Sequence, residues 1–116
     1  MSNKAQVKKQ LPIKHSSVDF HRTVPFENGF HFYTSNGNYT GITATNLSEF
    51  SAKLQIIPAE SVTFHFQRKD FQNWIKNTIK FPKLAENISK LKGAQSPEDL
   101  RKEIVKTVET CKAPAF

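Results

Sequence analysis

The tripeptide Phe-His-Phe occurs twice in this chain of 116 residues, at positions 30–32 and 64–66. Histidine binds metal ions, transfers protons near neutral pH and stacks on nucleobases, so the repeated tripeptide has several chemical uses. A zinc site needs three or four ligands in a defined geometry. The other two histidines, His15 and His21, lie in sequence without clear periodicity, and no HxH or HxxxH spacing is present. We therefore expect no metal ion and no other cofactor.

Both tripeptides lie in segments whose apolar residues alternate, which is typical of β-strands. Phe30 and Phe32 share one face of the first segment, and His31 and Tyr33 share the other. If helices cover the phenylalanine face, His31, Tyr33 and His65 lie on an open face of the sheet, where they could stack on bases. The alternative, which we favour, is that two strands bury their phenylalanines, each contributing about 1.5–3 kcal/mol, and that the histidines are secondary.

Sequence motifs of catalysis are absent. The chain has no P-loop, no dinucleotide-binding fingerprint and no nucleophile elbow. Its one cysteine, Cys111, lies near the C-terminus, which excludes an internal disulfide and argues against a catalytic thiol. We therefore expect a protein without catalytic residues. Because no apolar run reaches the roughly 18–20 residues of a membrane span and no signal peptide is evident, we expect a cytoplasmic protein without membrane contact.

Positive charge is the best indication of a binding function. The net charge is +7; residues 1–17 carry four lysines and no acid, and residues 61–116 carry eleven basic and six acidic residues. Such a field attracts polyanions, because lysine contacts to phosphate supply affinity without sequence specificity. The alternative is that these basic residues are merely solvated. The residues that we expect to bind nucleic acid or another polyanion are Lys4, Lys8, Lys9, Lys14, Arg68, Lys69, Lys76, Lys80, Lys83, Lys90 and Lys92.

The segment Arg68-Lys69-Asp70 joins a predicted strand to a predicted helix. Free N–H groups at a helix start, beside two basic side chains, suit a phosphate group. Asp70 is also a good N-cap residue, and in that role it occupies the N–H donors and repels an anion. We therefore expect a capped helix with solvated basic neighbours at this junction.

Turn and capping residues divide the chain into a hairpin, a third strand and four helices. Asn36-Gly37 fits the centre of a type I′ turn between strands at 30–34 and 38–45. The third strand is predicted at 61–67. The predicted helices cover 46–57, 70–79, 81–91 and 96–110.

Three of the predicted helices begin with recognisable capping residues. Asn46 followed by Glu49 resembles a capping box, Pro82 fits the first helical position, and Ser96 fits an N-cap. The order ββαβααα predicts an α+β fold, a small three-stranded sheet (hairpin plus one strand) covered by about four helices. The chain divides into a flexible basic N-terminal tail at 1–17, a single domain at 18–112 and a short C-terminal tail at 113–116.

Across residues 29–105 the chain resembles a family of small α+β domains of unknown function found mainly in archaea. The matching segments are FHFY, TGITATNLSEF, SVTFHFQRKDFQNWI and LAENISKL, followed by EDLRKEI. Some members look like modules attached to, or encoded near, enzymes of sugar or phosphoenolpyruvate metabolism. The resemblance therefore implies an accessory or regulatory binding role without known catalytic residues.

The chain departs from this family pattern between two predicted helices. Where relatives have a turn of glycine and an acidic residue, this chain has IKFPKLAE, with Lys80 and Lys83. The lysine-bearing tail also lies outside the matching region. Both differences favour a polyanionic partner over a metabolic one.

Two hypotheses of function follow. The first is a non-catalytic basic protein that binds RNA, a ribonucleoprotein such as the ribosome, or DNA through its lysine-rich tail and surface. The second is a protein–protein adaptor or regulatory domain for a metabolic enzyme. Binding that weakens steeply with salt indicates the first, whereas a protein partner retained after nuclease treatment indicates the second.

Overall fold

The computed structural model describes residues 20–91 and 96–111. In chain order the elements are η1 (Phe26–Asn28), β2 (Phe30–Tyr33), β3 (Tyr39–Ala44), α1 (Leu47–Leu54), α2 (Ala59–Arg68), α3 (Asp70–Asn77), α4 (Pro82–Ser89) and α5 (Pro97–Thr110). The predicted tails at 1–17 and 113–116 lie outside the described residues. None of the described helices is long and apolar enough to cross a membrane.

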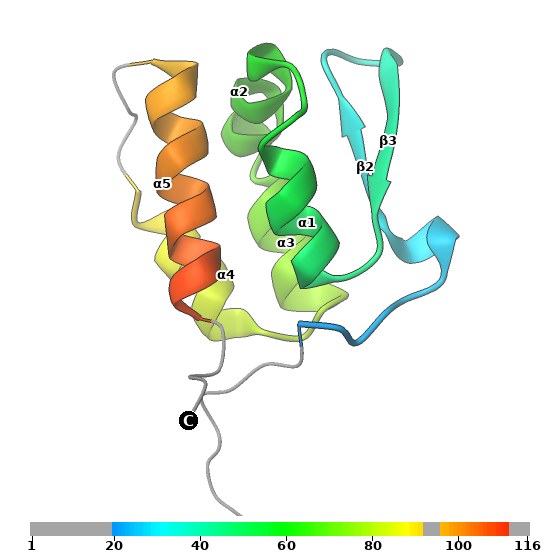
Figure 1. Ribbon diagram of the computed structural model, residues 1–116, viewed down its shortest axis with the longest axis vertical. Helices are drawn as coiled ribbons and strands as arrows, with labels where there is room; N and C mark the ends of the chain where they lie inside the picture. Colours follow the sequence, from blue (N-terminus) through cyan, green and yellow to red (C-terminus); the bar gives the residue numbers. More distant parts are fainter. Residues whose placement is uncertain (1–19, 92–95, 112–116) are drawn as a thin grey trace, which may run out of the picture.

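The helices lie on one side of a β-hairpin (Figure 1). The hairpin flanks one side of the molecule and α5 the other, with α1, α2 and α3 between them. Strand β3 packs against α1 and β2 packs against α2, while α5 contacts α1, α2 and α4. The predicted α+β class is confirmed. The details differ, because the described residues form a two-stranded antiparallel sheet and five α-helices in place of three strands and four helices.

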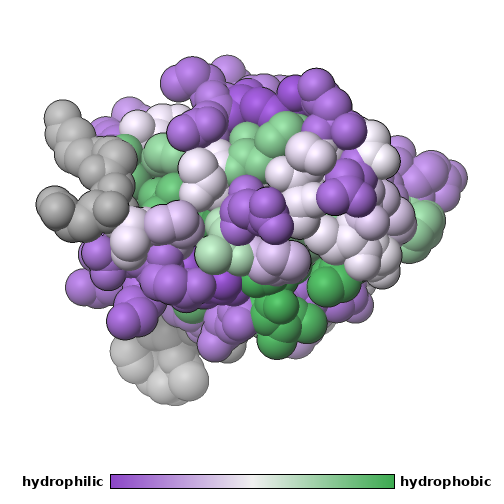
Figure 2. All heavy atoms as spheres, turned by 90° about the horizontal axis from the view of Figure 1, so that it is seen from above, coloured by the Kyte–Doolittle hydropathy of each residue, from purple (hydrophilic) through white to green (hydrophobic). Residues whose placement is uncertain are grey.

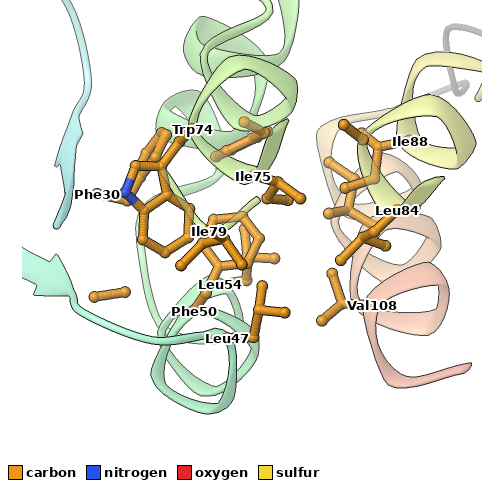
Figure 3. Close-up of a cluster of buried hydrophobic side chains, with 14 of the residues drawn as sticks. Phe30, Leu47, Phe50, Leu54, Trp74, Ile75, Ile79, Leu84, Ile88 and Val108 are labelled. Atoms are coloured by element: carbon orange, nitrogen blue, oxygen red, sulfur yellow. The ribbon is translucent and has the colours of Figure 1, made fainter. Parts of the chain in front are cut away.

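One hydrophobic core extends from the hairpin to the C-terminal helices (Figure 3). At the hairpin end it is aromatic, since the ring centroids of Phe30, Phe50 and Trp74 lie 5.5–5.7 Å apart. At the other end it is aliphatic, with Ile88 of α4 and Val108 of α5 fully buried. The first Phe-His-Phe therefore buries its phenylalanines under the helices, as the sequence predicts.

The predicted strand at 61–67 is wrong, because these residues belong to helix α2. Burial follows a helical spacing: Ser61, Val62 and His65 are buried, whereas Phe64 and Phe66 are partly exposed. Neither Phe64 nor Phe66 therefore lies at the centre of the core. Packing of the helix decides the structure here in preference to the β-propensity of the segment.

The start of α2 also differs from the prediction. Pro58, the residue directly after the predicted helix at 46–57, occupies the N-cap position of α2. Glu60 follows in the first turn, where a negative charge favours a helix start. The sequence Pro-Ala-Glu at 58–60 therefore carried a helix signal that the alternation obscured.

Asp70 is not the N-cap of its helix, in contrast to the prediction. Lys69 ends α2 and occupies the N-cap position of α3, with φ 65° and ψ 24°. The carboxylate of Asp70 instead accepts hydrogen bonds from His65 and Arg68. One residue in the left-handed region therefore joins the two helices, and Asp70 turns back towards α2.

The hairpin turn is also not of type I′. The Asn38 N–H donates to the Ser35 carbonyl at 3.0 Å, and Gly37 has a φ of 77°. Type I′ requires positive φ at both central positions, and Asn36 does not have it. The hairpin itself is confirmed, with antiparallel pairing of β2 and β3.

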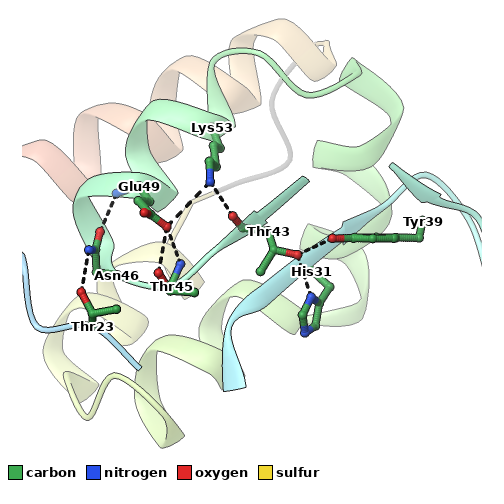
Figure 4. Close-up of polar contacts among 8 residues, drawn as sticks. All are labelled: Thr23, His31, Tyr39, Thr43, Thr45, Asn46, Glu49 and Lys53. Carbon is green, nitrogen blue, oxygen red and sulfur yellow. Dashed lines mark hydrogen bonds and ion pairs between the residues drawn. The ribbon is translucent and has the colours of Figure 1, made fainter. Parts of the chain in front are cut away.

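The predicted helix starts at Asn46, Pro82 and Ser96 are confirmed. Asn46 Oδ1 accepts the Glu49 N–H at 2.7 Å (Figure 4). The Glu49 carboxylate accepts bonds from the N–H and hydroxyl of Thr45, at 2.8 and 2.9 Å, and so differs from a standard capping box. These bonds lower the pKa of Glu49 below its ordinary value.

Arg101 of α5 closes the C-terminal end of α1. Its Nη1 donates to the carbonyls of Leu54 and Ile57 at 2.6 and 2.8 Å, and its Nε donates to Glu98 at 2.9 Å. Carbonyls at the end of a helix lack partners within the helix. A side chain 47 residues further along the chain supplies one here.

Candidate functional site

A cleft of about 400 Å³ lies between the hairpin and α2. His31, Tyr33 and Asn36 line it from the hairpin and its turn, and Phe64 and Arg68 line it from α2. Clefts that bind small ligands have volumes of roughly 300–1,000 Å³ and combine aromatic surfaces with a few polar groups. The cleft therefore brings together four of the candidate binding residues that the sequence analysis named, namely His31, Tyr33, His65 and Arg68.

His65 forms part of the inner wall of this cleft, and only 3% of its surface is exposed. Its Nε2 accepts the backbone N–H of Tyr33 at 2.8 Å, so the ring proton lies on Nδ1, which donates to Asp70 Oδ2 at 2.8 Å. Burial lowers the pKa of His65, against the opposing effect of the Asp70 carboxylate. The alternative in which His65 lies on an open face of the sheet and stacks on bases is wrong, because His65 belongs to helix α2 and its ring is buried.

Arg68 spans the mouth of the cleft. Its Nε donates to Asp70 Oδ2 at 3.0 Å, and its Nη1 donates to Asn36 Oδ1 in the hairpin turn at 3.3 Å. The guanidinium carbon lies 5.0 Å from the centroid of the Phe64 ring. Two of the roughly five N–H donors of a guanidinium are used in these bonds, and the side chain is 52% exposed. Arg68 is thus oriented by the fold and still presents donors to a ligand.

The hairpin side of the cleft is a cluster of partly exposed rings. His31 Nδ1 bonds the Thr43 hydroxyl at 2.7 Å, and the Tyr39 hydroxyl bonds the same oxygen at 2.5 Å (Figure 4). The rings of Tyr33 and Tyr39 lie 5.4 Å apart, and the Phe26 ring lies 5.2 Å from His31. These contacts hold the outward-facing rings of β2 in fixed positions, as the alternation in residues 30–33 predicts.

The predicted basic surface is only partly described. Lys69, Lys76 and Lys80 are exposed and make no ion pair within the described residues. Lys83 and Lys90 are also exposed, and each approaches Glu86, at 3.7 and 4.0 Å. Lys4, Lys8, Lys9, Lys14 and Lys92 lie outside the described residues.

Two of these lysines hold unusual backbone conformations. Lys69 and Lys80 have φ of 65° and 70°, in the left-handed region that usually favours glycine. Both follow a helix, where a positive side chain interacts favourably with the helix dipole. Both positions have a backbone geometry that glycine adopts more easily, and both are occupied by lysine.

Sequence reasoning missed Asn36, Phe64 and Asp70 as residues of the cleft. The sequence pattern predicts Asn36 in the turn, Phe64 in the core and Asp70 at a helix cap. The run Arg-Lys-Asp after an aromatic residue was the available signal, but the strand assignment at 61–67 concealed it. Within residues 20–91 and 96–111, no three His, Cys, Asp or Glu side chains gather in a way that could hold a metal ion.

Comparisons with protein-family models, curated proteins and solved structures found no match for this chain. The properties of the cleft and its surroundings therefore carry the functional argument.

Proposed function

We propose that this protein binds nucleic acid without catalysing a reaction. The observation that carries the proposal is the cleft between the hairpin and α2, in which aromatic rings stand beside an oriented arginine. Aromatic side chains and arginine are the groups on which unpaired bases stack. Exposed Lys69 at the start of α3, with Lys76 and Lys80 at and beyond its end, supplies positive charge for phosphates.

His65, the buried one of the two histidines in the cleft, is not available as a general base. A general base needs a nitrogen that can reach the substrate proton. His65 has both ring nitrogens engaged, one by Tyr33 and one by Asp70. The Asp70 carboxylate is itself shared between His65 and Arg68. This group therefore joins β2, α2 and α3, and the role that we propose for His65 is structural.

Among the basic residues, we assign the largest contribution to the lysines without acidic neighbours. Lys76 and Lys80 make no ion pair in the described part of the chain, and Lys69 adjoins Arg68 at the cleft. Lys83 and Lys90 share the field of Glu86, which reduces their attraction for phosphate. The tail lysines at 4–14 are part of the same proposal.

The test compares two double variants that remove the same charge from different faces. Lys76→Gln with Lys80→Gln alters α3 and the turn after it; Lys102→Gln with Lys106→Gln alters exposed positions of α5, away from the hairpin. Binding of a labelled unstructured RNA, and of DNA of the same sequence, is measured by fluorescence anisotropy over a series of KCl concentrations.

We expect wild-type affinity to fall steeply with salt. The first double variant should reduce the slope of log K against log salt by about 1.4, and the second should leave it nearly unchanged. Equal effects of both variants would mean that net charge alone is responsible. Absence of salt-dependent binding would overturn the proposal.

A protein–protein adaptor is a second candidate function, favoured by exposed apolar side chains. Phe26, Ile56 and Tyr39 are 62%, 69% and 42% exposed. On the face shown in Figure 2, hydrophobic areas are separate from one another and bordered by hydrophilic residues. If one protein is retained from cell lysate after nuclease treatment and at high salt, while the oligonucleotides fail to bind, the adaptor is the better explanation.

A further inference from the structure

We infer that the cleft between the hairpin and α2 takes a single unpaired nucleobase, with the phosphates of the strand passing outside it. The inference rests on the proposed function and makes it specific, since it assigns bases and phosphates to different parts of the surface. It also predicts single-stranded nucleic acid as the ligand, because a paired base would first have to leave its duplex.

Flat surfaces line two sides of the cleft. On the α2 side, the Arg68 guanidinium lies over the Phe64 ring, with its central carbon 5.0 Å from the ring centroid. On the hairpin side, His31 and Tyr33 contribute their rings. A nucleobase is a planar ligand with two π-faces, and both aromatic rings and guanidinium planes stack on it.

The charge in the cleft suits a base better than a phosphate. Asp70 lines the cleft 3.0 Å from Arg68, so the two opposite charges largely cancel there. A phosphate inside the cleft would approach the Asp70 carboxylate and be repelled. A base is neutral, and its edges carry both donors and acceptors.

Polar groups that match such an edge lie at the rim. Asn36 and Ser35 in the hairpin turn can each donate and accept hydrogen bonds. Asp70 Oδ2 accepts from His65 and Arg68, which leaves Oδ1 as the carboxylate oxygen available to an N–H of a base. Lys69, which follows Arg68 and is exposed, lies outside the cleft lining, where the strand's phosphates would run.

The first test compares a ten-nucleotide single strand with an abasic strand of the same length and charge, by fluorescence anisotropy at one salt concentration. RNA and DNA versions are both measured. A base that stacks on aromatic side chains should make the normal strand bind about tenfold or more tightly than the abasic strand. If the two strands bind with equal affinity and this binding weakens with salt, the inference is overturned and the proposed function stands. Failure of both strands to bind overturns both.

The second test uses two phenylalanines of the same helix as a matched pair. Phe64 lines the cleft, whereas Phe66 packs against the core, and both are partly exposed. Phe64→Leu should lower the affinity for the normal strand roughly five- to tenfold and leave the abasic strand unchanged. Phe66→Leu should change neither. Equal losses in the two variants, after both are shown to be folded by circular dichroism, contradict the assignment.

A measurement on the unaltered protein completes the test without depending on variants. In ¹⁵N-edited NMR spectra, the Arg68 Nε–H and the Asn36 side-chain amide should shift on titration with the normal strand. The abasic strand should leave these two signals in place while shifting the backbone amides of exposed lysines. Identical shifts with both strands overturn the inference.

Discussion

The two Phe-His-Phe tripeptides are the same three residues used in opposite ways. In β2, Phe30 and Phe32 are buried and His31 faces outward, partly exposed. In α2, His65 is buried and its flanking phenylalanines are partly exposed. The first tripeptide contributes its two phenylalanines to the core and His31 to the surface of the cleft. The second tripeptide contributes a buried, hydrogen-bonded His65 and places Phe64 in the lining of the same cleft.

The difference follows from geometry and not from the tripeptide. A strand alternates faces every residue, so two phenylalanines around a histidine share one side. In a helix, adjacent residues lie about 100° apart, and the middle one can point inward while its neighbours lie along the flanks. Phenylalanine alone therefore does not indicate burial, and histidine alone does not indicate exposure.

Truncating one phenylalanine in each tripeptide should give the largest contrast. Phe32→Ala removes a fully buried ring, and we expect it to lower the free energy of unfolding by about 3–5 kcal/mol. Phe64→Ala removes a partly exposed ring and should cost about 1 kcal/mol. Urea denaturation followed by Trp74 fluorescence measures both. Similar losses would mean that the two tripeptides are not used differently.

Replacing each histidine by leucine should lower the folding stability more in the second tripeptide than in the first, which is the reverse of the phenylalanine result. His65→Leu leaves the Tyr33 N–H and part of Asp70 without a partner, and we expect a loss of about 2–3 kcal/mol. His31→Leu loses one bond to Thr43, whose hydroxyl keeps Tyr39 as a partner, and should cost less than about 1 kcal/mol. Thermal unfolding of the two variants under the same buffer provides the check.

The pH dependence of stability should depend on the buried histidine. Burial keeps the pKa of folded His65 below its unfolded value near 6.5, so the unfolded chain takes up a proton first as pH falls. Stability is then full above pH 6.5 and decreases below it, by at most about 1.4 kcal/mol per pH unit for one proton. Protonation would also place an Nε2–H against the Tyr33 N–H.

Denaturation curves at pH 7.5, 6.0 and 5.0 test this expectation. The His65→Leu variant should lose less stability between these values than the wild type does, and His31→Leu should follow the wild type. Glu49 is a separate contributor, because its lowered pKa affects stability only below the ordinary range of glutamate, about 4.3. Identical pH profiles for all three proteins would refute the role assigned to His65.

The smallest effect concerns Lys69, which ends the helix that carries the second tripeptide. Lys69 has positive φ, which glycine adopts at less cost, so Lys69→Gly should stabilise the fold by about 0.5–1 kcal/mol. Lys76→Gly within α3 removes the same charge at an ordinary helical position and should destabilise by about 1 kcal/mol. Loss of stability in both variants would contradict the strain assigned to Lys69.

The parts of the fold that could be predicted are those with local signals. Asn46 and Ser96 cap their helices through bonds three residues away, and Gly37 supplies the turn of the hairpin. Helix α2 has no side-chain cap of this kind to mark its start. Its identity depends on burying Val62 and His65 against distant elements, which a pattern of alternating phenylalanines does not reveal.

The cleft could be predicted only in part for the same reason. His31, Tyr33 and Arg68 were recognised by residue type. Their meeting depends on contacts across 32 residues of sequence, from Tyr33 to His65 and from Asn36 to Arg68. Once α2 is assigned as a strand, those contacts cannot be anticipated, and His65 is placed on the wrong surface.

The bond from Arg101 to the end of α1 has a consequence for the order of synthesis. During translation α1 is synthesised before α5, so the Leu54 carbonyl and the surface of α1 that α5 later contacts lack these partners at first. The hairpin and first helices therefore emerge as an incomplete structure with exposed apolar surface. The contacts of α1 are therefore complete only when α5 has been synthesised and has packed against it.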